Sequence, residues 1–219
     1  MPHPIYVINP NSDTRVTAGL DAAVAPLRLA GGPPIECVTL ADGPPGVQTQ
    51  LDVDTAALSV HRFAMARRGQ ASAFVIACFS DPGLHLLRET AGVPVLGISE
   101  SAGLTAMTMG GGFGVIAILQ GAIPRHLRAW GAMGVHSRCV GEIAIGRGVS
   151  ALADRPATLK AMVDAGLRLR DERGAQVLVM GCAGMASFRG PLQEAVNLPV
   201  VEPTQAATAM ALGRVLIGW

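Results

Sequence analysis

Short runs of apolar residues, many of them β-branched, recur along the chain, and segments with helical spacing separate several of them. The apolar runs predict strands at residues 5–9, 35–40, 73–78, 94–98, 113–118, 138–145, 177–182 and 199–203. The segments 52–68 and 157–173 have the apolar spacing of helices. Alternating strands and helices are typical of parallel sheets covered by helices, and continuously apolar strands indicate that both faces of a sheet are buried. The pattern therefore predicts an α/β fold.

The second half of the chain repeats landmarks of the first half at a nearly constant distance. Four landmarks recur in order 102 to 105 residues later: Cys37 and Cys139, Cys78 and Cys182, Pro94 and Pro199, and Met107 and Met210. A repeat of this length is enough for one small α/β lobe. We infer an internal duplication that gives two pseudo-symmetric lobes, each a four-stranded parallel sheet flanked by helices.

Two of the repeated landmarks are cysteines at the carboxyl ends of predicted strands. Ligands of open parallel sheets gather outside that end of the strands. If the lobes face each other about a pseudo-twofold axis, Cys78 and Cys182 approach one cleft from opposite sides, and we expect the active site there. A thiolate could then remove a proton from a carbon beside a carbonyl while the opposite thiol returns one, which inverts the stereocentre without a cofactor. This chemistry needs each thiol pKa to fall from about 8.5 toward the working pH.

The residues after each cysteine suggest how the site is completed. Asp81 is a good N-cap and Pro82 a good first helical residue, so we expect a helix there whose positive end faces the Cys78 loop. After Cys182, the small residues Ala183 and Gly184 let backbone amides approach a substrate closely, and Ser187 is a candidate cap for the next helix. Backbone donors at an enolate oxygen are worth ~3 kcal/mol each in the subtilisin example.

Further pocket residues follow from position along the chain. Phe79 and Ser80 come directly after Cys78, so we expect both in the pocket. Asn9 and Asn11 end the first strand, where they either contact substrate or form an Asx turn that opens the next helix.

Composition excludes several classes of function. The 219 residues are 50% hydrophobic, carry a net charge of +1 and include few aromatic residues, which argues against nucleic-acid binding. No uninterrupted apolar run approaches the ~18 residues of a membrane span. The first residues lack the profile of a secretory signal, so we expect a cytoplasmic protein with four free thiols. The cysteine spacing fits no zinc pattern, and we expect neither a metal nor another cofactor.

The remaining chemistry-bearing residues have simpler interpretations. Cys37 and Cys139 lie in the middle of predicted strands, which is typical of buried, unreactive thiols. His61, His85 and His126 fall in predicted helices near arginines, and we expect them to face solvent. No histidine lies at a strand end, which argues against a Cys-His or Ser-His hydrolase. The glycine-rich stretch 110–114 precedes a strand, so it predicts a helix-strand loop instead of a dinucleotide site.

Four segments together resemble the aspartate/glutamate/hydantoin racemase superfamily, and most of all its hydantoin and allantoin racemase branch. These are INPN at 8–11, CFSDPGL at 78–84, PVLGISESA at 94–102 and GCAGM at 181–185. The resemblance runs in order over essentially the whole chain. It implies a cofactor-independent racemase of 5-substituted hydantoins or allantoin, with Cys78 and Cys182 as its two bases. It also implies a homo-oligomer and a carboxy-terminal helix that returns to the first lobe, so we expect lobes of 1–98 with 206–219, and 99–205.

One departure from the family pattern concerns the substrate pocket. Such racemases often carry a hydroxyl residue just after the strand that opens the second lobe, where this chain has Ala117, Ile118 and Leu119. We expect Ile118 to line the pocket and to make its wall more apolar. Two other enzymes on this scaffold stay open as alternatives, an arylmalonate decarboxylase and an isomerase of unsaturated diacids. A small-molecule-binding protein without catalysis is a third alternative.

Overall fold

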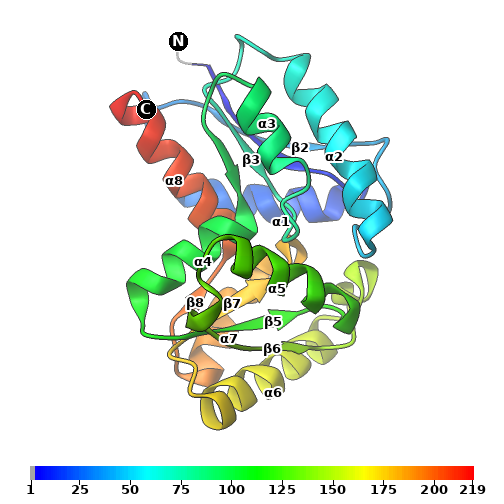
Figure 1. Ribbon diagram of the computed structural model, residues 1–219, viewed down its shortest axis with the longest axis vertical. Coiled ribbons are helices and arrows are strands. Elements are labelled where there is room, and N and C mark those ends of the chain that lie inside the picture. Colours follow the sequence, from blue (N-terminus) through cyan, green and yellow to red (C-terminus); the bar gives the residue numbers. More distant parts are fainter. Residues whose placement is uncertain (1–2) are drawn as a thin grey trace. The chain divides into compact units, whose positions relative to one another are not determined.

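The computed structural model describes residues 3–219 and shows alternating strands and helices (Figure 1). The strands are β1 Ile5–Asn9, β2 Ile35–Thr39, β3 Ala73–Ile76, β4 Val95–Gly97, β5 Phe113–Ala117, β6 Cys139–Ala144, β7 Val177–Gly181 and β8 Val200–Val201. The helices are α1 Thr14–Val24, α2 Gln50–Met65, α3 Leu84–Thr90, α4 Ile98–Met109, α5 Ile123–Ala132, α6 Arg155–Arg173, α7 Arg189–Val196 and α8 Pro203–Ile217. No helix within residues 3–219 is both long and apolar enough to cross a bilayer.

The chain forms two compact units, Met1–Ser101 with Thr204–Trp219, and Ala102–Pro203. The first unit contains a sheet of order β2-β1-β3-β4 and the second a sheet of order β6-β5-β7-β8, with all neighbouring strands parallel. The two orders are the same when the second set of strands is renumbered from its own start. The predicted α/β fold with two four-stranded parallel sheets is therefore confirmed.

Helices cover both faces of each sheet. Because crossovers between parallel strands are right-handed, α1 lies on one face of the first sheet and α2 and α3 on the other (Figure 1). In the second sheet α5 takes the place of α1, and α6 and α7 lie together on the opposite face, where the Arg170 guanidinium on α6 donates to the Val196 carbonyl on α7 at 2.7 Å. The carboxy-terminal helix α8 contacts α1 in the first unit, where the Gln205 side chain donates to the Ala23 carbonyl at 2.8 Å.

The strands differ in how deeply they are buried. The central strands β1, β3, β5 and β7 are buried along nearly their whole length, as their continuous apolar runs predict. The expectation of burial on both faces is wrong for β2 and β6, which are mostly half-buried. Both lie at a sheet edge, but the edge strands β4 and β8 are buried, so edge position alone does not account for the difference.

Polar side chains fix several helix starts close to the positions expected from the sequence. Thr49 and Asp52 form a reciprocal capping box at the start of α2. Asp154 caps α6, and Gly174 ends that helix in the left-handed conformation that glycine adopts without strain. The glycine-rich stretch lies between α4 and β5, so its assignment as a helix-strand loop is confirmed.

Candidate active site

In the first unit, two predicted site segments follow adjacent central strands. Asn9 is the last residue of β1, and Cys78 comes two residues after β3. The strands pair up to Ile8 and Ile76, and the Ala77 amide extends the pairing by donating to the Ile8 carbonyl at 2.8 Å. Asn9 and the Cys78 loop therefore lie at the same carboxyl edge of this sheet.

The Asn9 side chain organises the loop after β1. Its Nδ2 lies 3.0 Å from Asn11 Oδ1, 3.1 Å from the Asp13 carbonyl and 3.0 Å from Thr17 Oγ1. Its Oδ1 accepts from the Asn11 amide at 3.2 Å, and the residue is fully buried. This is the Asx-turn alternative of the two that the sequence left open, and it engages both ends of the Asn9 amide.

Cys78 lies half-buried in a tight turn. Its side chain packs against a small apolar cluster of Val47, Val53 and Ala56, which come from α2 and the loop before it. The Cys78 carbonyl accepts from the Asp81 amide at 2.9 Å, which closes the turn. Within the turn Phe79 is buried and Ser80 is half-buried.

The helix start expected at Asp81 and Pro82 is wrong. α3 begins at Leu84, and its N-cap is Gly83, which has a left-handed backbone conformation and makes no capping side-chain bond. Asp81 itself has a positive φ of 44°, and its side chain is turned toward another helix. The physical reason is a long-range interaction, because the Asp81 carboxylate accepts hydrogen bonds from two backbone amides at the start of α4 and none at the start of α3.

Asp81 caps α4 instead. Its carboxylate oxygens accept from the backbone amides of Ser99 and Glu100, each at 2.9 Å. The carboxylate occupies the space where a side chain at Gly97 would lie, since a Cβ built there would be 2.3 Å from Asp81 Cγ. Burial raises the pKa of the Asp81 carboxyl to about 7, although the two amide donors oppose this shift. Asp81 thus ties the Cys78 turn to the end of β4 and the start of α4.

In the second unit, the predicted site residues again follow adjacent central strands. Ile118 comes directly after β5 and Cys182 directly after β7, and the two strands pair up to Ala117 and Gly181. Gly181 is required here, because a Cβ at that position would be 2.7 Å from the Ile116 carbonyl oxygen. Ile118 is buried at the same carboxyl edge of the sheet as Cys182.

Cys182 begins a turn of 3-10 helix, Ala183–Phe188. The Cys182 carbonyl accepts from the Met185 amide at 3.1 Å, Ala183 is buried and Gly184 is half-buried. Burial raises the pKa of the Cys182 thiol to about 11, and the carboxylate of Glu202 adds to this shift while a hydrogen bond from the Gly184 amide opposes it. In this structure Cys182 is therefore protonated at neutral pH, which differs from the expected fall because desolvation outweighs the amide donor.

Two further expectations in the second unit are wrong. Ser187 does not cap α7, which starts after Phe188 without a side-chain cap; Ser187 is exposed and accepts from Arg155 at 2.7 Å. His126 does not face solvent, being only 3% exposed. The ring contacts a buried acid instead, which outweighs the cost of burying the imidazole. His85, by contrast, is exposed as expected.

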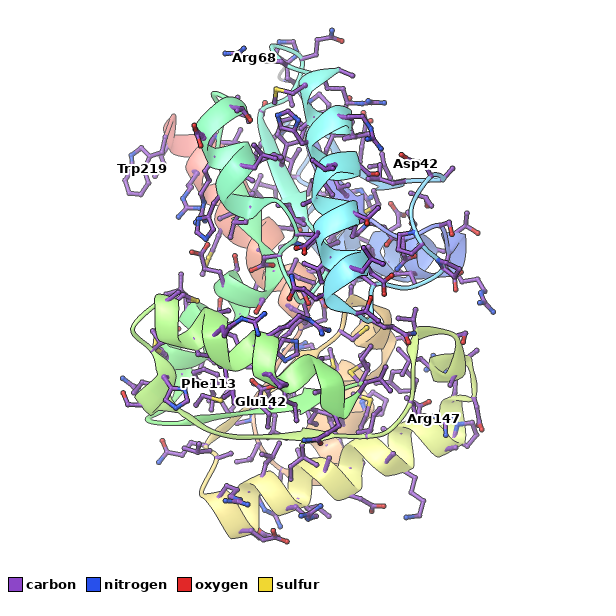
Figure 2. The ribbon with its side chains drawn as sticks, turned by 45° about the vertical axis from the view of Figure 1, so that its right-hand side comes forward. Asp42, Arg68, Phe113, Glu142, Arg147 and Trp219 are labelled. Carbon is purple, nitrogen blue, oxygen red and sulfur yellow. The ribbon has the colours of Figure 1, made fainter. Side chains whose placement is uncertain are left out.

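A buried polar cluster joins α5 to β6, and the sequence analysis missed it. His126 Nδ1 lies 2.8 Å from Glu142 Oε2, and Trp130 Nε1 donates to Glu142 Oε1 at 2.6 Å. The Glu142 side chain is fully buried, on the strand that lies against α5 (Figure 2). A signal existed in the sequence, because a lone charged residue inside a predicted apolar strand needs a buried partner.

Glu202 is a second residue that the sequence analysis passed over. It is 2% exposed, directly follows β8 and directly precedes α8. Of the remaining thiols, Cys37 and Cys139 are half-buried and burial raises the pKa of each to about 12. Within residues 3–219, no three His, Cys, Asp or Glu side chains are grouped as a metal site would need.

Two like-ordered parallel sheets, each with a cysteine after its third strand in sequence, define the α/β racemase fold. An allantoin racemase from Klebsiella pneumoniae superposes with a TM-score of 0.92 at 31% identity, over 99% of this chain and 89% of that one. An allantoin racemase from Pseudomonas fluorescens gives 0.90 at 29% identity, over 98% and 92%.

The sequence comparisons agree with the fold. A hydantoin racemase from Rhizobium meliloti is 35% identical over 213 residues, which cover 94% of this chain and 86% of the relative. The pattern of the Asp/Glu/Hydantoin racemase family matches residues 5–211. The chain belongs to the Asp/Glu/Hydantoin racemase family, which confirms the resemblance seen in its motifs and makes the protein an isomerase.

Proposed function

We propose that the protein racemises 5-substituted hydantoins or allantoin by proton transfer between substrate and two thiols, Cys78 and Cys182. The observation that carries this proposal is the equivalent position of the two cysteines, each following the third strand of a duplicated unit. The hydantoin and allantoin racemases among its relatives support the substrate class. The glutamate racemases and arylmalonate decarboxylases of known structure on this fold are 16–21% identical to the chain, so they support the fold and not a shared substrate.

The proposed reaction exchanges one proton for another at the ring carbon that carries the substituent. The thiolate of one cysteine takes the proton from this carbon, and the electron pair moves into the neighbouring carbonyl to give an enolate. The thiol of the other cysteine then donates its proton to the opposite face of the carbon. One C–H bond breaks and one forms, and the enzyme ends with the protonation states of its two cysteines exchanged, the former thiolate now a thiol and the former thiol a thiolate.

The loops after the cysteines supply the remaining functions in this proposal. The amides of Ala183 and Gly184 approach the substrate as hydrogen-bond donors, since neither residue has a side chain large enough to block them. Phe79 and Ser80 line the pocket beside Cys78 in this proposal. Ile118 provides an apolar surface for the ring substituent, being buried and without a hydroxyl.

Asn9 has a supporting role within the same proposal. Its amide is already bonded to Asn11, Asp13 and Thr17, so we assign it to holding the loop after β1 in place. Substrate contact by Asn9 would use the remaining lone pair of Oδ1, which already accepts from the Asn11 amide.

The proposal extends to the setting of the protein. Four free thiols suit a reducing cytoplasm. Self-association is supported by exposed apolar residues near the end of α8, where Leu216, Ile217 and Trp219 are 57%, 59% and 77% exposed. Trp219 projects away from the helix (Figure 2). Light scattering coupled to size exclusion tests this point, and a mass of one 22.5 kDa chain would contradict it.

The decisive experiment follows the circular dichroism of single-enantiomer 5-substituted hydantoins and of allantoin. The wild type is compared with Cys78→Ser and Cys182→Ser, and with Cys37→Ser and Cys139→Ser as matched thiol controls. We expect the signal to decay to zero with the wild type and both controls, and to decay at the uncatalysed rate with the two site variants. In D2O the substituted ring carbon should gain deuterium as the signal decays.

Other results would redirect the assignment. If wild type leaves all these substrates unchanged, the proposed substrate class is wrong, and arylmalonates and unsaturated diacids are the next substrates to test. If Cys78→Ser abolishes racemisation but Cys182→Ser does not, a two-thiol mechanism is wrong.

A further inference from the structure

The duplication pairs the end of β4 with the end of β8. Pro94 to Gly97 correspond to Pro199 to Glu202, so Gly97 and Glu202 occupy equivalent positions, each directly before a helix. The duplication likewise pairs Asp81 with Met185, since each lies three residues after its cysteine. Each unit thus has one acidic residue at this pair of positions. In the first unit the acid follows the cysteine (Asp81), and in the second unit it ends the last strand (Glu202).

The structure places the Asp81 carboxylate at the strand end that corresponds to Glu202. In the first unit, a Cβ at Gly97 would be 2.3 Å from Asp81 Cγ and 2.4 and 2.6 Å from its two oxygens. The Asp81 carboxylate therefore lies where a side chain at this strand end would begin. In the second unit the corresponding strand end has a side chain of its own, because Glu202 stands where the first unit has glycine, and the residue that corresponds to Asp81 is the fully buried Met185.

We propose that Asp81 and Glu202 are equivalent positioning residues, each placing one buried carboxylate beside its own cysteine loop, and that Glu202 keeps Cys182 in its protonated, proton-donating form. The last part rests on the proposed function, whereas the equivalence of the two carboxylates does not. Neither residue exchanges a proton with substrate in this proposal. They act through the cysteine loops.

The charges around each site agree with this assignment. On the Cys182 side, β7 and β8 pair as neighbours, so Cys182 and Glu202 follow adjacent strands, and both the Glu202 carboxylate and the Gly184 amide act on the thiol. A carboxylate beside a thiol disfavours the thiolate, and the raised pKa of Cys182 agrees in direction. On the Cys78 side, Asp81 faces Arg88 of α3 and Glu100 of α4. Arg88 also forms an ion pair with Glu100, so a cation partly offsets these two acids.

The first test measures the thiol and not the reaction. Cys182 alkylation by iodoacetamide is followed by peptide mass spectrometry from pH 7 to 12 in wild type, Glu202→Gln and Glu194→Gln, where Glu194 is an exposed glutamate of the same unit. Glu202→Gln removes a negative charge that disfavours the Cys182 thiolate. We therefore expect the alkylation midpoint of Cys182 to fall by about one pH unit. Glu194→Gln should leave it unchanged. An unchanged midpoint in a folded Glu202→Gln protein would overturn the role of Glu202.

The second test probes the exchange of positions directly, and it decides the matter if Glu202→Gln does not fold. Gly97→Glu alone should strongly destabilise the protein, because the new side chain meets the Asp81 carboxylate. The double variant Asp81→Met with Gly97→Glu rebuilds the pattern of the second unit and should recover most of the loss. Urea unfolding measures both. A double variant no more stable than Gly97→Glu would overturn the equivalence.

These outcomes separate the inference from the proposed function. A shifted Cys182 midpoint in a protein that racemises none of the tested substrates would support the carboxylate assignment while refuting the substrate class. If the wild type racemises the substrates but the Cys182 midpoint is unshifted in Glu202→Gln, the substrate class is supported and the role of Glu202 is refuted. In a racemising enzyme, Glu202→Gln should also move the pH dependence of the reaction in the same direction as the alkylation midpoint.

Discussion

The buried cluster of His126, Trp130 and Glu142 gives a sharp prediction for stability. Glu142→Ala removes the carboxylate that the other two side chains contact at 2.8 and 2.6 Å. The side chain of Glu142 is fully buried and that of His126 is 4% exposed, so water does not readily replace the lost acceptor. Losing one partner of a buried hydrogen bond costs about 1–3 kcal/mol, and Glu142→Ala removes two such bonds. We expect Glu142→Ala to lower the free energy of unfolding by about 3–5 kcal/mol.

A graded series distinguishes lost hydrogen bonds from lost packing. Glu142→Gln keeps the shape and one acceptor oxygen for Trp130, and its amide can donate to a neutral histidine ring, so we expect a loss of about 1–2 kcal/mol. Glu194→Ala removes an exposed carboxylate of the same unit and should change stability by less than about 0.5 kcal/mol. Urea unfolding followed by circular dichroism gives all three values. A Glu142→Ala loss below about 1 kcal/mol, or one equal to that of Glu142→Gln, would refute the reasoning.

Three further predictions concern the first unit and the two other thiols. Gly97→Ala should lower the free energy of unfolding in urea by about 3 kcal/mol, because the new Cβ would displace Asp81 and break its two hydrogen bonds to the amides of α4. The matched control is Gly19→Ala, where no atom lies within 4 Å of the new Cβ, and it should be neutral or stabilising. The raised pKa of Asp81, about 7 when folded against 3.8 ordinarily, means that the folded state holds this proton more tightly. The stability that this bound proton contributes is therefore complete below pH 4 and is lost as the pH rises through 7. In thermal melts from pH 4 to 8, the melting temperature of the wild type should fall with pH for this reason, and that of Asp81→Asn should lack this part of the fall. Equal slopes of melting temperature against pH in the two proteins would contradict the prediction. Cys37 and Cys139, each with a pKa of about 12, should resist iodoacetamide at pH 8 until the protein is unfolded, and rapid labelling of either in the folded state would show that its environment is misjudged.

The strands were predictable because their signal is local. All eight expected strands exist, and most observed ends lie within one or two residues of the predicted ones, since an apolar β-branched run is itself the cause of burial in a parallel sheet. The repeated landmarks also placed Cys78 and Cys182 after equivalent strands. Local patterns failed where a side chain chose a distant partner. Asp81 before Pro82 looks like a helix start, but its acceptors serve amides that come 18 and 19 residues later.

The same limit explains the errors in the second unit. His126 lies among arginines on a short helix, which locally favours exposure, and only the pairing with Glu142 from another strand buries it. Ser187 resembles a cap, but Arg155 from α6 engages its hydroxyl. In each case the sequence shows a polar group that needs a partner and does not show which partner the fold supplies. The duplication is the one long-range signal that the sequence carries, and it relates Gly97 to Glu202.

In the proposed two-thiol mechanism, a Cys182 that is protonated at neutral pH does not favour one direction of the reaction. After Cys182 donates its proton, the enzyme holds a thiolate there and a thiol at Cys78, which is the form that accepts the opposite enantiomer. Glu202 raises the energy of that second form, so individual kcat and KM values for the two enantiomers can differ. Their kcat/KM values cannot, because two enantiomers have equal free energy in water and the equilibrium constant of racemisation is one. Glu202→Gln must therefore change kcat/KM by the same factor in both directions. Unequal factors would mean that the measured signal includes an irreversible step such as decarboxylation or ring opening, and that the chemistry at these two thiols is not racemisation alone.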